Sequence, residues 1–210
     1  MRDWFKKNLS SGELRVFKRL NSPQKVQDFL ETIQTNFESG GETVMSPRRV
    51  LREKKAHCME AALFAAAVFL FHGRKPLLLD LRASKKDLDH VVALFNEGEK
   101  WGAISKSNHA TIRYRDAVYK SPRELALSYF HEYFSNDGTK NLRSFSKPFD
   151  LRSLKQKDWI TAEEDLWYID RAMNKIKHTK IVTKEEIKKL RKADPIERRV
   201  GKLTTWKKPA

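Results

Sequence analysis

Apolar side chains recur at helical spacing over the first third of the chain and then form one long apolar run. In residues 14–20 and 26–33 they return every three or four positions, which is typical of amphipathic helices. Ser22 and Pro23 supply a cap and a first helical position ahead of the second of these helices. Residues 59–71 are apolar at all but one position. This run predicts a helix that is buried on almost all sides.

The pattern changes to that of short strands after residue 73. Apolar runs bounded by turn or polar residues occupy residues 76–81, 90–95 and 100–104. Residues 96–99, Asn-Glu-Gly-Glu, suit a tight hairpin between the second and third runs. Residues 111–115 alternate and predict a fourth strand. We therefore expect a small antiparallel sheet in the middle of the chain.

Helical signals return in the last part of the chain. Ser121 and Glu124 supply the two halves of a capping box, and further helices are expected from Thr161 and from Thr183. Helices, then strands, then helices is the order of an α+β protein. A chain of 210 residues has room for one well-buried domain.

The net charge of +16 lies mostly at the C-terminal end of the chain. Residues 171–210 carry 14 Lys and Arg against 4 Asp and Glu, a balance of +10, whereas the remaining 170 residues carry 29 against 23. We therefore expect a single domain over residues 1–170, followed by a basic segment over residues 171–210 that is helical or partly disordered.

Three interpretations of this basic segment stay open. It could bind an anionic partner such as nucleic acid, a membrane surface or an acidic protein. It could be a solvated tail that keeps the protein soluble. It could also belong to the fold, with its apolar side chains docked on the core. Those side chains are Ile176, Ile181, Ile187 and Leu190.

The sequence favours a cytoplasmic protein without a transmembrane segment. Residues 1–7 lack the apolar core of a secretory signal, and the apolar run over residues 59–71 is about 13 residues long, short of the roughly 20 that span a bilayer. One free cysteine fits a reducing compartment. The chain has no P-loop, dinucleotide-binding glycine pattern, EF-hand loop, C-x-x-C pair or H-E-x-x-H motif. We therefore expect no cofactor and no metal site.

Cys58 is the only cysteine, and it stands immediately before the long apolar run. A single thiol cannot form an internal disulfide, so it is either a core residue or a nucleophile. The first turn of a helix favours the nucleophile, because unpaired backbone N–H groups and the helix dipole stabilise a thiolate there. His90, at the start of a predicted strand, is the candidate base.

A thiolate–imidazole pair also needs a polar group that holds the imidazole in one tautomer. Four candidates follow the strand of residues 100–104, namely Ser105, Ser107, Asn108 and Asp116. Asn108 is favoured, since its side-chain carbonyl can accept the Nδ1–H of His90. Each member also has a purely structural interpretation, with Cys58 in the core, His90 bonded to a backbone carbonyl and Asn108 in a turn.

These segments resemble the transglutaminase-like core of the papain-like cysteine enzymes, and more narrowly a bacterial branch of that superfamily. The resemblance covers roughly residues 45–135 and is carried by residues 58–64, 77–81, 89–95, 100–108 and 124–130. It implies Cys58 as the nucleophile, with its backbone N–H in the oxyanion hole, and His90 as the base. The family's aspartate falls by spacing on Ser105, which carries no charge. Either Asn108 has taken over that position's task, giving a Cys-His-Asn set, or the triad is impaired.

The resemblance implies a papain-like fold and a cysteine-dependent hydrolase or acyltransferase. Such an enzyme acts on an amide or peptide-like bond through an acyl-enzyme. A second hypothesis is a non-catalytic protein that keeps this scaffold and engages an anionic partner through residues 171–210.

Overall fold

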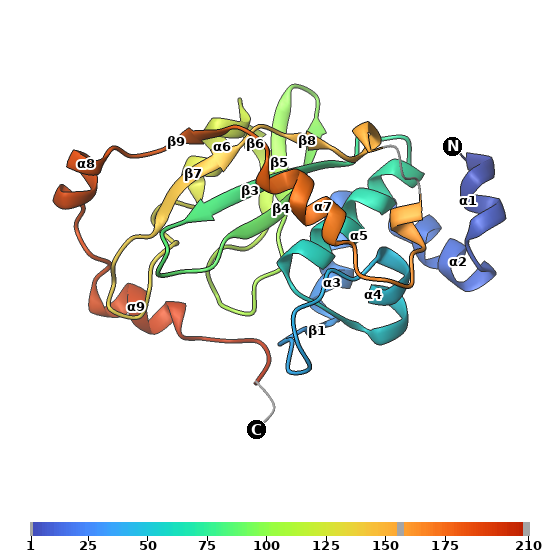
Figure 1. The fold of residues 1–210 in the computed structure, drawn as a ribbon, viewed down its shortest axis with the longest axis horizontal. Helices are drawn as coiled ribbons and strands as arrows, with labels where there is room; N and C mark the ends of the chain where they lie inside the picture. The colour runs from blue at the N-terminus through green and yellow to red at the C-terminus, as the bar shows by residue number, and fades with distance from the viewer. Residues whose placement is uncertain (1, 155–157, 208–210) are drawn as a thin grey trace.

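The computed structural model describes residues 2–154 and 158–207 and shows an α+β fold (Figure 1). The α-helices in these ranges are α1 (Arg2–Asn8), α2 (Ser11–Arg19), α3 (Pro23–Glu31), α4 (Pro47–Glu53), α5 (Cys58–Phe71), α6 (Pro122–Ser128), α7 (Trp167–Asn174), α8 (Lys184–Lys189) and α9 (Pro195–Gly201). Two short 3₁₀ helices are η1 (Leu151–Ser153) and η2 (Asp158–Ile160). None of the helices in the described ranges is long and apolar enough to cross a membrane.

The main sheet has the strand order β6-β5-β4-β3-β7-β9, and all neighbouring strands are antiparallel. A further short strand, β8, pairs with the start of β3, whereas β7 pairs with its end. Its strands are β3 (Leu77–Ala83), β4 (His90–Glu97), β5 (Lys100–Ile104), β6 (Arg115–Tyr119), β7 (Leu142–Ser146), β8 (Phe149–Asp150) and β9 (His178–Lys180). A separate parallel pair is formed by β1 (Gln34–Thr35) and β2 (Lys55–Ala56).

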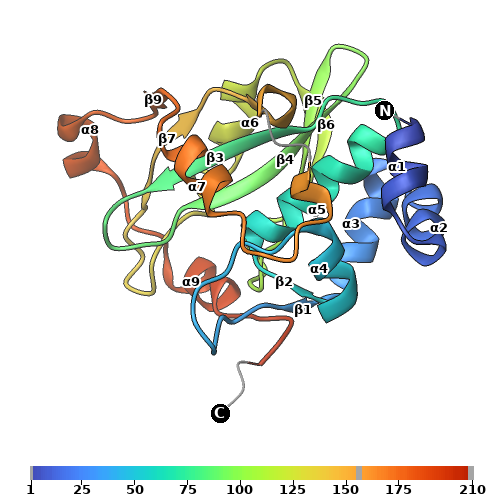
Figure 2. The ribbon, with the colours of Figure 1, turned by 45° about the vertical axis from the view of Figure 1, so that its right-hand side comes forward.

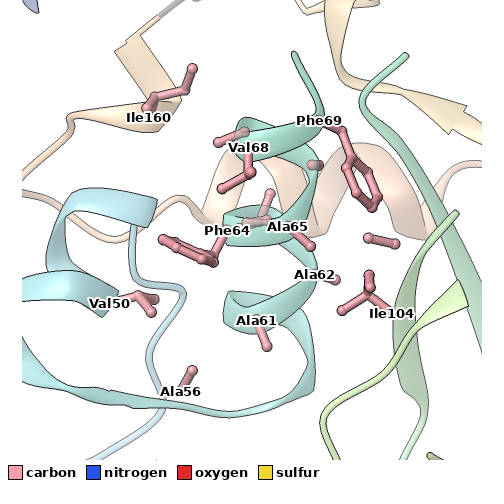
Figure 3. Packing of buried hydrophobic residues seen from close by; sticks show 14 of the residues in the cluster. Val50, Ala56, Ala61, Ala62, Phe64, Ala65, Val68, Phe69, Ile104 and Ile160 are labelled. Carbon is pink, nitrogen blue, oxygen red and sulfur yellow. The ribbon is translucent and has the colours of Figure 1, made fainter. Parts of the chain in front are cut away.

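Helix α5 lies between the main sheet and the N-terminal helices α1–α4 (Figure 2). Its alanines let the helix approach its neighbours closely, and Figure 3 shows them between Val50 of α4 and Ile104 of β5. Larger side chains of α5 also pack against neighbouring elements. Phe64, for example, packs edge-on against Phe17 of α2, with ring centroids 5.8 Å apart. The long apolar run of the sequence is therefore the central buried helix, as its pattern predicts.

The sheet separates two apolar cores, and β3 contributes to both of them. Leu78 packs on the α5 side, whereas Leu79 and Leu81 pack with Leu125 and Tyr129 of the α6 side. A strand covered on both faces reads as a continuous apolar run instead of an alternating one. The strands predicted over residues 76–81, 90–95 and 100–104 are all confirmed as β3, β4 and β5.

The fourth strand predicted over residues 111–115 is wrong, because β6 begins only at Arg115. The chain turns sharply before it, with Ile112 at a positive φ of 60°. The backbone of Ile112 is held by side chains on both sides: its N–H donates to Glu132 Oε2 (2.8 Å), and its carbonyl accepts from Ser105 Oγ (2.6 Å). The residues just before β6 therefore form a turn, although apolar and polar residues alternate there as they do in a strand.

The helix expected from Thr161 begins later, at Trp167. The preceding residues are held beside Val44 instead. Leu166 N donates to Val44 O (2.8 Å), and Val44 N donates to Asp165 Oδ1 (3.0 Å). These long-range hydrogen bonds hold the residues before Trp167 in a non-helical conformation, although their own sequence favours a helix.

The boundary predicted at residue 170 is also wrong, since it falls inside α7. The strand β9 then joins the main sheet beside β7, and Ile176, Ile181 and Leu190 pack against the two cores. Of the three interpretations of the basic segment, docking on the core is confirmed for these residues. The chain after α9 returns to the β5–β6 connection, where Thr205 N donates to Asn108 O (2.9 Å).

Candidate active site

Cys58 is the first residue of α5, and the preceding residue, His57, caps the helix. His57 Nδ1 accepts a hydrogen bond from Met59 N (3.2 Å), and His57 Nε2 lies 2.9 Å from the carbonyl of Thr43. Glu60 reaches back to accept from His57 N (2.9 Å), so the cap is reciprocal. The helix start is therefore held rigidly on both sides of the thiol.

Glu60 has a carboxylate that is fully buried and fully engaged. It accepts hydrogen bonds from Thr43 Oγ1 (2.7 Å), Met45 N (3.0 Å) and Asn36 Nδ2 (3.1 Å) in addition to His57 N. Four donors thus converge on this carboxylate beside the helix N-terminus. Glu60 accordingly complements the start of α5, as its sequence position predicts.

The β4–β5 hairpin brings His90 and Ser105 together, because Ala93, three residues after His90, pairs with Ile104, the residue before Ser105. His90 Nε2 lies 2.8 Å from Ser105 Oγ. The single hydroxyl proton of Ser105 is donated to Ile112 O (2.6 Å), so Ser105 Oγ acts as the acceptor for Nε2–H of His90. In the neutral ring this leaves Nδ1 of His90 without a proton and available as a base.

The environment of Cys58 favours its thiolate. Burial alone would raise the pKa of the thiol, but the charge of His90 and hydrogen bonding by His57 and His90 outweigh it, and the pKa falls well below its ordinary value. The side chain is nevertheless partly exposed to a cavity. A low pKa combined with access to solvent is the signature of a reactive cysteine.

His57, the residue before Cys58, is half-buried. Burial lowers the pKa of His57, but the Cys58 thiolate and the Glu60 carboxylate raise it more, to about 10. The ring therefore caps α5 when it is neutral and is driven to take up a proton when Cys58 ionises. Two imidazoles thus flank one sulfur. The apolar run signals a helix start, but its sequence alone does not show that a histidine can cap it.

Asn108 does not orient His90, and this prediction is wrong. Asn108 Oδ1 accepts from Trp206 N (2.9 Å) and Thr35 Oγ1 (3.3 Å), while its Nδ2 donates to Trp206 O (3.1 Å). Its amide is occupied in tying the C-terminal end of the chain to the β5–β6 connection. Ser105 Oγ, and not the Asn108 amide, lies within hydrogen-bond distance of His90.

The cavity beside Cys58 has a volume of about 470 Å³. His90, the loop after β3, the β5–β6 connection, residues 132–136 and α9 form its walls. The backbone N–H of Cys58 makes no hydrogen bond to another described residue, as expected at the first helical position. The cavity thus brings together a thiol with a lowered pKa, an imidazole and a backbone N–H without a partner among the described residues.

A larger cavity of about 730 Å³ lies elsewhere, among α2, α3 and α4. Its walls are mainly apolar, with Val16, Phe29 and Leu51 among them, and neither Cys58 nor His90 reaches it. The size of a cavity therefore does not identify the reactive centre of this chain.

Within residues 2–154 and 158–207, no group of three or more His, Cys, Asp and Glu side chains is arranged to hold a metal ion. Comparisons with known proteins do not assign this chain to a family. No protein-family model matches the chain, and a search of curated proteins finds no significant match.

Proposed function

We propose that this protein is a cysteine-dependent hydrolase or acyltransferase that acts on amide or peptide-like bonds. The observation that carries the proposal is the partly exposed Cys58 at a helix N-terminus, with its pKa lowered by His90, whose ring is in turn held by Ser105. The order of these parts is that of the papain-like transglutaminase core: a cysteine opening a buried helix, a histidine on a following strand, and a polar residue after the next strand. The three residues come from separate parts of the chain.

In the proposed mechanism the Cys58 thiolate attacks the substrate carbonyl carbon and forms a tetrahedral intermediate. The backbone N–H of Cys58 stabilises the oxyanion. His90, protonated at Nδ1, donates this proton to the leaving amine as the C–N bond breaks, and a thioester forms at Cys58. Water resolves the thioester to an acid, or an amine resolves it to a new amide.

Ser105 gives this triad an orienting group without a negative charge. It holds Nε2–H of His90 and so presents Nδ1 to the sulfur, but it supplies no charge to stabilise the imidazolium. We therefore expect slower acylation than in a triad completed by a carboxylate. The charge of the second imidazole, His57, adds to the stabilisation of the thiolate.

The acyl-enzyme is tested with p-nitrophenyl acetate, an activated ester that needs no specific pocket. The native protein should release a burst of p-nitrophenolate and gain one acetyl group on Cys58 in the intact mass. Cys58→Ala should lose both signals, and His90→Gln should slow the burst. Equal acetylation of the native protein and Cys58→Ala would contradict the proposal.

A second candidate function is binding of an anionic partner through the basic C-terminal segment. Its support is the exposure of Lys184, Lys188 and Lys189 on α8, none of which makes an ion pair with another described residue. Deletion of residues 171–210 is not a clean test, because it would remove β9 from the sheet. Charge removal at these three lysines is the better variant. It should weaken binding to nonspecific DNA or anionic vesicles and reduce the salt dependence of that binding.

A cytoplasmic location stays a prediction under both functions.

A further inference from the structure

The charged side chains around the cavity of Cys58 differ in whether they have partners. Three carboxylates line it, and each is engaged by the protein. Asp87 accepts from Asn141 Nδ2 (2.9 Å), Asp89 accepts from Ala83 N (2.8 Å), and Glu132 accepts from Ile112 N (2.8 Å) and pairs with Arg115 (2.7 Å). All three carboxylates of the cavity wall thus accept hydrogen bonds from the protein.

Three cations of the wall, Arg198, Lys86 and Lys106, make no ion pair with any described residue, but Lys106 donates to two backbone carbonyls. Of the other two, Arg198 is the more constrained. Its Nε is buried and has no hydrogen-bond partner within the described part of the chain, whereas Lys86 is an exposed residue. The guanidinium of Arg198 thus has no hydrogen-bond acceptor within the described residues, and an acceptor on a ligand in the cavity would supply one to its accessible nitrogens. The charged side chains of this wall that lack any partner among the described residues are therefore cations.

Arg198 is presented by a firmly seated helix. Figure 1 shows α9 under the loops at the end of the sheet, with the following chain running on toward β1. A Cβ at Gly138, which has a φ of +83°, would lie 3.2 Å from Arg198 Cδ, and one at Gly201 would lie 2.9 Å from the ring of Phe134. The carbonyl of Gly201 also lies 2.8 Å from His109 Nδ1. The guanidinium is thus carried on a backbone held closely at several points.

We propose that Arg198 selects substrates that carry a carboxylate close to the bond attacked by Cys58. This inference rests on the proposed function and names the substrate class for the same cavity. A guanidinium binds a carboxylate through two paired N–H donors and by opposite charge. A neutral amide on a substrate lacks this charge and therefore binds the guanidinium less tightly. The carboxylate could be an acidic side chain or the C-terminal carboxylate of a peptide.

The test compares alkylation of Cys58 by iodoacetate, an anion, with alkylation by iodoacetamide, its neutral counterpart. In both reactions the sulfur displaces iodide from the same type of carbon, so their rate ratio reports the charge of the cavity. Arg198→Gln should lower the iodoacetate-to-iodoacetamide ratio about fivefold. Arg198→Lys, which keeps the charge, should retain most of it. Arg199→Gln is the matched control, because Arg199 is an exposed neighbour on the same helix and the change in net charge is equal.

An unchanged ratio in Arg198→Gln, with iodoacetamide still reacting at the native rate, would overturn the inference and leave the proposed function standing. If native Cys58 were inert to both reagents, the proposed function would fail and the inference with it. Loss of the native circular dichroism in Arg198→Gln would transfer the decision to Arg198→Lys. An iodoacetate-to-iodoacetamide ratio in folded Arg198→Lys that falls well below that of Arg199→Gln would then contradict selection by charge, and an equal ratio in the two variants would support it.

The source of the carboxylate is distinguished by protection of Cys58 against iodoacetamide. N-acetylaspartic acid α-amide presents a side-chain carboxylate, N-acetylalanine presents a terminal one, and N-acetylalanine amide is the neutral control. Protection by one or both acids that is lost in Arg198→Gln supports the proposal and identifies the source. Protection by neither acid, or equal protection by the neutral amide, would contradict it.

Discussion

His90 and His178 are both largely buried imidazoles on strands of the main sheet, yet their ring nitrogens have different surroundings. His178 lies between two acceptors, with Nδ1 2.8 Å from Ile176 O and Nε2 2.9 Å from Asp80 Oδ2. His90 has one such partner, Ser105, and its other nitrogen is left for Cys58. His178 does not line the cavity of Cys58, whereas His90 does.

Under the proposed function, a histidine–carboxylate pair does not by itself mark the catalytic centre. The His178–Asp80 pair joins β9 to β3 across the sheet and has no nitrogen left for a nucleophile. The His90–Ser105 pair has a weaker, uncharged partner but faces a thiol and a cavity. An unoccupied nitrogen beside an accessible nucleophile is therefore the more informative feature.

The largest expected effect separates the two histidines by the reactivity of Cys58. His90→Gln should slow alkylation by iodoacetamide about 10- to 100-fold near pH 6.5, because the thiol loses the imidazole that favours its ionised form. His178→Gln should leave this rate unchanged. Stopped-time alkylation with mass detection measures both variants, and equal slowing by the two substitutions would remove the distinction between the sites.

The next effect is on stability and falls on His178. His178→Gln should lower the free energy of unfolding by about 2 kcal/mol, since it breaks a largely buried pair and leaves Arg82 as the one charged partner of Asp80 among the described residues. His90→Gln should cost less, because Ser105 is a neutral partner. Urea unfolding followed by circular dichroism gives both values, and a larger loss in His90→Gln would reverse the assignment.

Ser105 tests the orienting step itself. Ser105→Ala should slow acylation of Cys58 by p-nitrophenyl acetate about tenfold, because His90 loses the acceptor that fixes its tautomer. Ser107→Ala is the matched control, since Ser107 lines the same cavity but accepts from His109 N instead. An unchanged acylation rate in Ser105→Ala would show that the hydroxyl does not orient the base.

The smallest effect concerns Lys106, which follows Ser105 in the sequence. Like that of His178, its side chain is hydrogen-bonded to acceptors of the protein. Its Nζ donates to Leu30 O (2.8 Å) and Ile33 O (2.6 Å), and burial lowers its pKa to about 8. The unfolded chain holds this proton up to a higher pH, so stability should rise with pH above about 8, by about 1 kcal/mol between pH 8 and 9.

This rise should be absent in Lys106→Met, and urea unfolding at the two pH values measures the difference. Subtracting the change in unfolding free energy of Lys106→Met from that of the native protein removes the contribution of groups that titrate in both. A parallel pH dependence in native protein and variant would show that Lys106 does not titrate in this range.

Local signals predict much of the fold. The apolar run predicts α5, and the polar break over residues 96–99 predicts the hairpin that joins His90 to Ser105. The strands β7 and β9 are harder to recognise, since they carry polar and charged residues at positions 143, 144, 178 and 180 and depend on pairing with distant segments. Tertiary pairing decides strands of this kind more than local preference does.

The candidate site was predictable in its two main parts but not in its third. A helix start and a hairpin are local structures, so they place Cys58 and His90 from nearby sequence alone. The choice between Ser105 and Asn108 depends on Trp206, which is far away in sequence and occupies the amide of Asn108. The same long-range return of the chain brings Arg198 to the cavity, and no local pattern signals it.

The pKa of Cys58 is the most direct test of the central claim that His90 activates this thiol. Because the chain has one cysteine, thiolate absorbance near 240 nm reports that residue in a pH titration, with Cys58→Ala as the blank. The account predicts an apparent pKa well below about 8.5 in the native protein and a rise toward that value in His90→Gln. A native thiol that titrates at or above 8.5, or one whose titration is the same in His90→Gln, would contradict it.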